Sequence, residues 1–407
     1  MRLQRWGALA AILFSVLGFA SPGGAAGIAG PSSPTLANCV ATVNAIHPGW
    51  GNASPSADQS AAWSMPMRLA ALSKGINYTD SFEPEVSASR RTQDFARLRQ
   101  LGLRHIRLPF DPASVLAWST QGTPDARLKR LDETVCLAVS AGLAVMLNVQ
   151  PQDPLVLKDT GGPETLEKLA AIWDHLAARY AVFPPDRMMF EALNEPTLTD
   201  GSRWEAAQRI LLAHICHQAP HHTVLLTASP DSTAGALAGI TPVDDPEVAY
   251  VFHFYSPMSF THQGADWSSA ELGSIKRLSY PAEPGNVAGV RRRAIAVADR
   301  SLSNYLADYT NAKGIEGEID IAARWAAEHH VSLVATEFGV YNSVAPPASR
   351  VAWLRDVRRA LETRSIGWTV WEYRGGFGID ADLARACDAE ASVRNALGLC
   401  RAAQRTR

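Results

Sequence analysis

Two glutamates of this chain each follow a short apolar run of sequence. Glu195 comes just after residues 188–193, and Glu337 comes directly after residues 332–336. A pair of carboxyl groups suits the cleavage of a glycosidic bond, because the leaving oxygen needs a proton and the oxocarbenium-like transition state needs a negative partner. One carboxyl group must therefore be protonated while the other is ionised at the same pH. We predict that Glu195 and Glu337 form such a catalytic pair.

The neighbouring residue types suggest which glutamate is the acid. Arg107, and a hydroxyl group donated by Tyr255, would favour the ionised form of a nearby Glu337. Glu195 would then lie beside that negative charge in a less cationic pocket. We expect this position to raise the pKa of Glu195, so that Glu195 serves as the acid.

Candidate substrate-binding residues stand at the ends of other apolar runs. The Asn194 amide can hydrogen-bond a sugar 2-hydroxyl, and the flat face of Trp371 suits a pyranose ring. His253 lies two residues before Tyr255 at the end of its run. Each of these side chains could instead pair with a neighbour at a strand edge. Their convergence at the ends of five runs favours one functional site.

The elements that position these residues follow a regular pattern. Eight apolar runs alternate with amphipathic helical stretches, and they predict eight strands at residues 74–78, 105–109, 144–149, 188–193, 223–227, 249–254, 332–336 and 367–371. Eight alternating units indicate an α/β fold that is a closed (β/α)8 TIM barrel rather than an open doubly wound sheet. No GxGxxG motif follows the first strand and no GxxxxGK(S/T) motif occurs, so a nucleotide-binding fold loses its main support. In a (β/α)8 barrel, functional groups gather at the C-terminal ends of the strands.

The barrel is expected to form a single catalytic domain over residues 65–407. Residues 255–331 form a long connection, which we interpret as an inserted lobe beside the active-site mouth. Residues 1–26 are predicted to be a signal peptide, with Arg2 and Arg5 before an apolar stretch that is shorter than a membrane span of about 20 residues. Residues 27–64 are rich in Pro, Ser, Ala and Gly and are predicted to be a linker or irregular lead-in. The chain is therefore expected to be secreted or periplasmic, with no membrane contact after signal removal.

Composition limits the partners. The chain has 47% hydrophobic residues, 19% charged residues and a formal net charge of -2, which gives no reason to expect nucleic acid or an anionic membrane as partner. We expect a monomer that acts on a polysaccharide or oligosaccharide. His214, Cys216, His217, His221 and His222 match no standard zinc spacing, so no metal site is predicted from them.

Five cysteines are present, and in an oxidising compartment some should pair. Cys387 and Cys400 are close in sequence and are our predicted disulfide. Cys136 and Cys216 lie on apolar helix faces and are predicted to be buried thiols. The odd number leaves at least one cysteine free or in an intermolecular bond.

Several of these segments resemble glycoside hydrolase family 5 of clan A. The similarity lies in residues 104–109, 190–196, 253–255, 335–339, 371–373 and 375–378, and it covers about residues 73 to 380. Arg, Asn-Glu, His-x-Tyr, Glu and Trp in this order are specific to the family, whereas Asn-Glu-Pro alone is common to the clan. The resemblance implies a retaining mechanism with Glu195 as acid/base, Glu337 as nucleophile, and no metal or organic cofactor.

The chain departs from the family pattern at the third strand. That strand usually ends in a histidine near the cleavage point, and here Gln150 takes the position. A glutamine can still hydrogen-bond a sugar hydroxyl, so activity is expected to survive, but the resemblance says less about the substrate. His262 and Trp267, in the loop after the sixth strand, are expected to line the cleft, with a structural role as the alternative.

The sequence thus predicts an exported retaining endo-β-1,4-glucanase, similar to cellulases. A β-mannanase or a β-1,3-glucanase on the same site is the alternative within enzymes. A non-catalytic polysaccharide-binding protein is an alternative from another class. The presence of both glutamates argues against it.

Overall fold

The computed structural model describes residues 34–46, 64–83, 85–112, 126–151, 162–387 and 392–400. The predicted signal peptide lies outside the described residues, as do residues 27–33 and 47–63 of the predicted lead-in. Among the helices of the described ranges, none combines the length and the apolar character that a membrane crossing requires.

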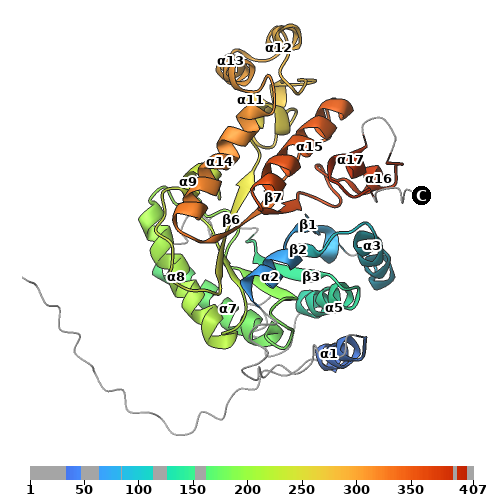
Figure 1. Cartoon of the computed structure of the whole chain (residues 1–407), viewed down its shortest axis with the longest axis vertical. Helices are drawn as coiled ribbons and strands as arrows, with labels where there is room; N and C mark the ends of the chain where they lie inside the picture. Colours follow the sequence, from blue (N-terminus) through green and yellow to red (C-terminus); the bar gives the residue numbers. More distant parts are fainter. Residues whose placement is uncertain are drawn as a thin grey trace, which may run out of the picture.

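Eight parallel strands close into a barrel in sequence order, each paired with its neighbours and β1 paired with β8 (Figure 1). They are β1 (Lys74–Asn77), β2 (His105–Phe110), β3 (Ala144–Val149), β4 (Met188–Glu191), β5 (Val224–Leu226), β6 (Val248–Phe254), β7 (Ser332–Phe338) and β8 (Gly367–Val370). All eight overlap the predicted strands. The predicted (β/α)8 TIM barrel is therefore confirmed.

Helices surround the barrel. The longer ones are α1 (Pro34–Ile46), α2 (Met65–Ala71), α3 (Ala88–Gln100), α5 (Ala126–Ser140), α7 (Pro163–Tyr180), α8 (Gly201–Gln218), α12 (Pro284–Arg291), α13 (Asp299–Asp308), α14 (Lys313–Glu328) and α15 (Pro347–Thr363). The short ones are η2 (Asp80–Phe82), α9 (Ala234–Leu237), α10 (Met258–Thr261), α11 (Ala270–Ser274), η3 (Ala296–Ala298), α16 (Asp380–Leu383) and α17 (Val393–Ala396). The connection from β6 to β7 carries α10 to α14, and Figure 1 shows α11, α12 and α13 gathered to one side of the barrel. This is the lobe expected from the length of the connection.

The core has two layers. Inside the barrel, small and unbranched side chains such as Ala144, Met146 and Met189 are fully buried against one another. Leu72, which follows α2, belongs to this inner cluster and closes the N-terminal end of the barrel. The outer layer packs the other face of every strand on the helices, so both faces of the sheet are apolar.

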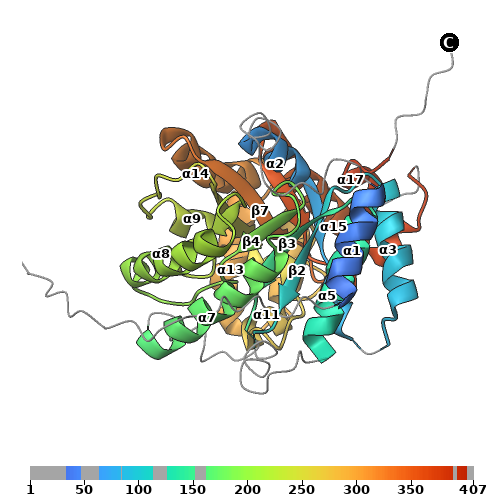
Figure 2. The ribbon, with the colours of Figure 1, turned by 90° about the horizontal axis from the view of Figure 1, so that it is seen from below.

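The lead-in prediction was wrong for residues 34–46, which form α1. This helix packs on α5 at the outside of the barrel, where Figures 1 and 2 both place it. Leu36 and Val43 are buried there, so the helix owes its stability to one apolar face.

Cys39 on α1 is bonded to Cys136 on α5. The prediction that Cys136 is a buried thiol was therefore wrong, because its partner lay in the segment expected to be irregular. The predicted Cys387–Cys400 disulfide is present. Cys216 is a free, half-buried thiol, and burial raises its pKa to about 11.

Candidate active site

Glu195 lies just beyond β4, where the chain leaves the barrel. Its φ of 36° lies in the left-handed region that non-glycine residues rarely adopt. The turn is held by the loop after β5, because the Asp231 backbone N–H and the Ser229 hydroxyl both donate to the carbonyl of Pro196, at 3.0 and 2.9 Å. These bonds fix the direction in which the Glu195 side chain leaves the backbone.

Glu337 is placed by an irregularity near the end of β7. Phe252 pairs with Ala335 but His253 pairs with Glu337, so Thr336 is an extra residue in β7. Such a bulge bends a strand and changes the direction of the next side chain. Glu337 is 4% exposed, and the Tyr255 hydroxyl donates to its Oε2 at 2.8 Å.

Arg107 links the site across the barrel. Its Nη1 donates to Glu337 Oε1 at 2.6 Å and to Asn77 at 2.9 Å, its Nη2 donates to Asn194 at 2.8 Å, and it makes two bonds to Glu191. These five bonds use all five N–H donors of the fully buried guanidinium group. Burial lowers the pKa of Arg107, but the charges of Glu191 and Glu337 outweigh it and raise that pKa above its ordinary value. Arg107 is therefore permanently charged, and all of its hydrogen-bond donors are already in use.

His253 lies between the two glutamates. Its Nδ1 is 2.7 Å from Glu195 Oε1 and 3.5 Å from Glu337 Oε2. Burial would raise the pKa of Glu195, but the hydrogen bond and charge of His253 outweigh it and lower that pKa. Burial raises the pKa of Glu337 in spite of His253 and Arg107. The directions are thus opposite to the expected order, because burial outweighs the cationic neighbours at Glu337, whereas the hydrogen bond and charge of His253 outweigh burial at Glu195.

A cavity of about 570 Å³ opens over the two glutamates. All the predicted site residues except the buried Arg107 line it: Gln150, Asn194, Glu195, His253, Tyr255, His262, Trp267, Glu337 and Trp371. Trp267 is 62% exposed and offers a flat apolar face to solvent. The structure therefore brings these candidates, from five strands and the β6–β7 connection, into one cleft.

Aromatic side chains pack into one wall of this cleft. The His262 ring lies 5.1 Å from the Tyr255 ring and 5.2 Å from the Phe377 ring, measured between centroids. Burial lowers the pKa of His262 to about 4, so this histidine is neutral at neutral pH. Its ring also lies 6.0 Å from the ring of Trp267. His262 thus connects the tyrosine that holds Glu337 to the exposed tryptophan.

The structure also places in or beneath the site residues that were not among the candidates expected from the sequence, including Asn77, Glu191, Asp231, Glu318 and Phe377. Glu191 could have been found, because a charged residue in the buried strand β4 needs a partner. Asp231 and Glu318 carry no such signal, because one lies in a loop and the other on a solvent-facing helix.

One group of side chains in the described ranges could hold a metal ion. Glu195, His253 and Glu337 bring one ligand atom each within 4.8 Å of one another. The 2.7 Å between His253 Nδ1 and Glu195 is a hydrogen-bond distance. Two ligands on one tetrahedral zinc ion would be roughly 3.3 Å apart, given metal–ligand bonds of about 2.0–2.1 Å. The cluster is therefore arranged for sharing a proton.

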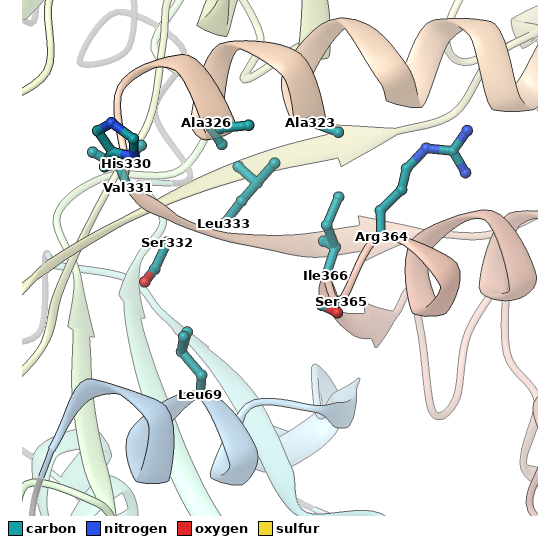
Figure 3. A pocket seen from close by; sticks show the side chains of 11 residues that line it. Leu69, Ala323, Ala326, His330, Val331, Ser332, Leu333, Arg364, Ser365 and Ile366 are labelled. Atoms are coloured by element: carbon teal, nitrogen blue, oxygen red, sulfur yellow. The ribbon is translucent and has the colours of Figure 1, made fainter.

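Figure 3 shows a second pocket, at the opposite end of the barrel. It has a volume of about 340 Å³, and Leu69 of α2, Ala323 of α14 and Leu333 of β7 contribute to its walls. The strands begin at this end, whereas barrel active sites lie where the strands finish. The cleft above the two glutamates is the better candidate for a catalytic site.

Known proteins share this fold and sequence pattern. The chain is 28% identical over 335 residues to Endoglucanase 3 of Fibrobacter succinogenes, covering 76% of this chain but only 50% of that protein. It is 25% identical over 293 residues to Endoglucanase C of Acetivibrio thermocellus, covering 69% of this chain and 83% of that protein. The crystal structure of endoglucanase Cel5A from Thermotoga maritima superimposes with a TM-score of 0.63 at 24% identity, over 82% of this chain and 99% of that one.

The family assignment rests on a match to a family model. The family described as cellulase, glycosyl hydrolase family 5, matches residues 70–376 of the 407-residue chain. This range contains all eight strands and every residue of the cleft except Phe377. The chain therefore belongs to glycosyl hydrolase family 5, as its motifs predict, and is a glycosyl hydrolase.

Proposed function

We propose that this chain is an exported retaining endo-β-glucanase that cleaves β-1,4-linked glucan. The observation that carries the proposal is the arrangement of Glu337 and Glu195. An oxygen of each carboxyl group lies within 4.8 Å of the other, with Arg107 and Tyr255 bound to Glu337. Retaining enzymes keep their two carboxyl groups about 5–5.5 Å apart, and inverting enzymes about 6.5–9.5 Å.

In the proposed reaction, Glu337 Oε2 attacks the anomeric carbon while Glu195 donates a proton to the departing glycosidic oxygen. A glycosyl ester on Glu337 and a shortened chain result. Glu195 then removes a proton from water, which attacks the anomeric carbon and releases Glu337. Both steps retain the β configuration overall, because each one inverts it.

His253 has a specific part in this scheme. In the free protein it lowers the pKa of Glu195, so that a proton tends to sit on the imidazole rather than on the carboxyl group. The 2.7 Å contact lets this proton pass to Glu195 Oε1 when a glycosidic oxygen arrives as acceptor. The pair then titrates as a unit, and neither residue alone sets the alkaline limit of activity.

The substrate assignment rests on what the cleft can and cannot bind. Trp371 and Trp267 offer ring faces to a pyranose, and Asn194 and Gln150 offer amides to its hydroxyl groups. Arg107 has no free donor for an acidic sugar. The names of the similar proteins, endoglucanases from two bacteria, support a glucan. A β-mannanase is the second candidate, since Thermotoga maritima Cel5A, 23% identical, has been crystallised with mannotriose.

Export is proposed from the predicted signal peptide, and the two disulfides support it because such bonds persist in oxidising compartments. The test is viscometry with the mature protein. Soluble β-1,4-glucan should lose viscosity faster than reducing ends accumulate, and mannan, xylan and polygalacturonate should react much more slowly. Equal or higher specific activity on mannan would refute the glucanase assignment. Release of glucose with nearly unchanged viscosity would refute endo action.

A further inference from the structure

The lobe formed by the β6–β7 connection carries a concentrated positive charge. Residues 276–300 contain six basic and two acidic residues, a formal charge of +4, whereas the whole chain has a net charge of -2. One of the two acids, Asp299, is paired with Arg291 at 2.7 Å. The other, Glu283, precedes α12, whose eight residues span about 12 Å, so it lies at the opposite end of that helix from Arg292. The net charge of the whole chain therefore conceals a basic segment.

Two of these cations line one pocket, and a third lies beside them. The pocket has a volume of about 240 Å³, and its walls include Lys276 of the α11–α12 connection and Arg293, just after α12. A Cβ placed on Gly289 would lie 3.7 Å from Nη1 of Arg293 and 3.8 Å from Nη2 of Arg292. In the described part of the chain, the side chains of these three cations have no hydrogen bond or ion pair. Because like charges gathered at one place repel each other, the pocket favours an anionic occupant.

Exposed aliphatic side chains adjoin this pocket. Ile295 is 45% exposed and Val297 is 62% exposed. Of the exposed large hydrophobic side chains in the described ranges, only these two stand two positions apart. The Ile295 N–H donates to the hydroxyl of Ser274, which lines the pocket, at 3.3 Å, and η3 with Val297 packs on α11 with Ser274. The lobe thus joins unpaired cations and exposed apolar side chains on one surface.

This docking surface, formed by Lys276, Arg292, Arg293, Ile295 and Val297, is separate from the catalytic cleft. None of the five residues lines the cleft. Figure 1 shows the lobe to one side of the barrel, with α12 and α13 outermost. A partner that covers the docking surface therefore does not need to displace a polysaccharide from the cleft.

We propose that the docking surface binds an anionic phospholipid membrane. Arginine forks match the geometry of lipid phosphate groups, and aliphatic side chains bind at the boundary between headgroups and acyl chains. Free phosphate or a soluble polyanion would pair with the cations but leave Ile295 and Val297 in water, whereas a membrane surface takes up both. The proposal goes beyond the hydrolysis of glucan and does not depend on it. It replaces the expectation of no membrane contact, which rested on the net charge of the whole chain.

The test is co-sedimentation of the mature protein with lipid vesicles. Residues 1–26 are left out, so that the predicted signal peptide cannot itself bind lipid. The vesicles contain phosphatidylcholine alone or phosphatidylcholine with phosphatidylglycerol, which is anionic. Each cation near an anionic surface changes the partition coefficient about fivefold, which corresponds to about 1 kcal/mol, so three cations should make binding to the anionic vesicles about a hundredfold tighter. Salt at 1 M should remove most of this difference, because it shortens the screening length to about 3 Å.

The first variant neutralises the three cations of the docking surface. It combines Lys276→Gln, Arg292→Gln and Arg293→Gln, and it should bind anionic vesicles about a hundredfold more weakly than the wild type. Its control loses the same charge at three exposed positions of α5, α8 and α15, outside the lobe. These are Lys129→Gln, Arg203→Gln and Arg359→Gln. The control should bind like the wild type, because its changes leave the docking surface intact.

The second variant removes the apolar part of the docking surface. Ile295→Ser combined with Val297→Ser should weaken binding to anionic vesicles at least about tenfold, since each buried CH₂ group contributes about fourfold. Val182→Ser combined with Ile210→Ser is its control, at two other exposed aliphatic positions. Both variants should hydrolyse soluble β-glucan at the wild-type rate, which also shows that they are folded.

Three results would overturn the inference. The first is equal binding of the wild type to neutral and anionic vesicles, and the second is equal binding of the cation variant and its control. The third is a loss of binding in the cation variant but not in the aliphatic variant, because free phosphate or a soluble polyanion would then explain the surface. If the cation variant fails to fold, binding of the wild type that 1 M salt does not weaken would refute the inference. A failure of the protein to hydrolyse glucan would refute the proposed function and leave the vesicle result unaffected.

Discussion

Replacing Tyr255 by phenylalanine removes one hydrogen bond from Glu337 and nothing else of comparable strength. The bond is 2.8 Å long, and it joins a hydroxyl group to a carboxylate that is 4% exposed. A hydrogen bond to a charged group contributes about 1.5–3 kcal/mol. Because it stabilises the ionised form, its loss should raise the pKa of Glu337 by about 1–2, at 1.36 kcal/mol for each pKa unit.

The sign of the effect on activity follows from the role proposed for Glu337. A nucleophile must be ionised, so activity is lost as the pH falls through its pKa. A higher pKa therefore moves the acid limb of the profile of kcat/KM against pH to higher pH, by about one unit or more. The assay is the initial rate of hydrolysis of a soluble β-glucan over a range of pH values, with the variant and the wild type in the same buffers.

Tyr250→Phe is the matched control. Tyr250 lies on the same strand, and its hydroxyl accepts a bond from the Val243 N–H at 2.7 Å, away from the catalytic pair. This variant should be less stable but keep the wild-type acid limb. Our reasoning would be refuted if the acid limb of Tyr255→Phe coincided with that of the wild type or moved to lower pH.

Other predictions concern the roles of the glutamates and the stability of the barrel. With an activated substrate and azide, Glu195→Ala should give the β-glycosyl azide and Glu337→Ala the α-glycosyl azide; proton NMR distinguishes them, and the opposite assignment would mean that the roles are reversed. Glu191→Ala should lower the free energy of unfolding in urea by about 3 kcal/mol, since it leaves Arg107 partly uncompensated, and an unchanged urea midpoint would contradict this. Cys39→Ser opens a bridge between residues 97 positions apart and should lower the free energy of unfolding by up to about 4 kcal/mol; equal stability of the variant and the oxidised wild type would show that α1 adds nothing.

The barrel could be predicted from the sequence because its strands carry a strong signal. Each strand is buried on both faces and reads as a short apolar run, and the strand at residues 144–149 was predicted with its observed ends. The helix α1 could not be predicted in the same way. It lies in a segment rich in small residues, and what holds it is a single apolar face and a bond from Cys39 to a cysteine far away in sequence.

The residues of the candidate site could be predicted where they lie at or near the ends of strands. Arg107, Glu195, Tyr255 and Glu337 all do so or lie close to such an end, and the contacts of Arg107 and Tyr255 with Glu337 are those expected from their types. The pKa order was not predictable. It depends on the burial of both carboxyl groups and on the hydrogen bond of His253 to Glu195 at 2.7 Å, and residue types alone indicate neither.

The two hydrogen bonds between Arg107 and Glu191 also have a consequence for the reaction intermediate. In the proposed mechanism, Glu337 loses its negative charge when it becomes a glycosyl ester, and the buried guanidinium group loses one of its two counter-ions. Glu191 takes no part in that reaction, and its two hydrogen bonds to Arg107 measure 2.6 and 2.8 Å in this structure. Leaving a buried charge unpaired costs about 3–5 kcal/mol. Glu191 thus acts as a fixed counter-charge that keeps this penalty out of the covalent intermediate, so that charge can leave the nucleophile without the barrel interior having to hold an isolated cation.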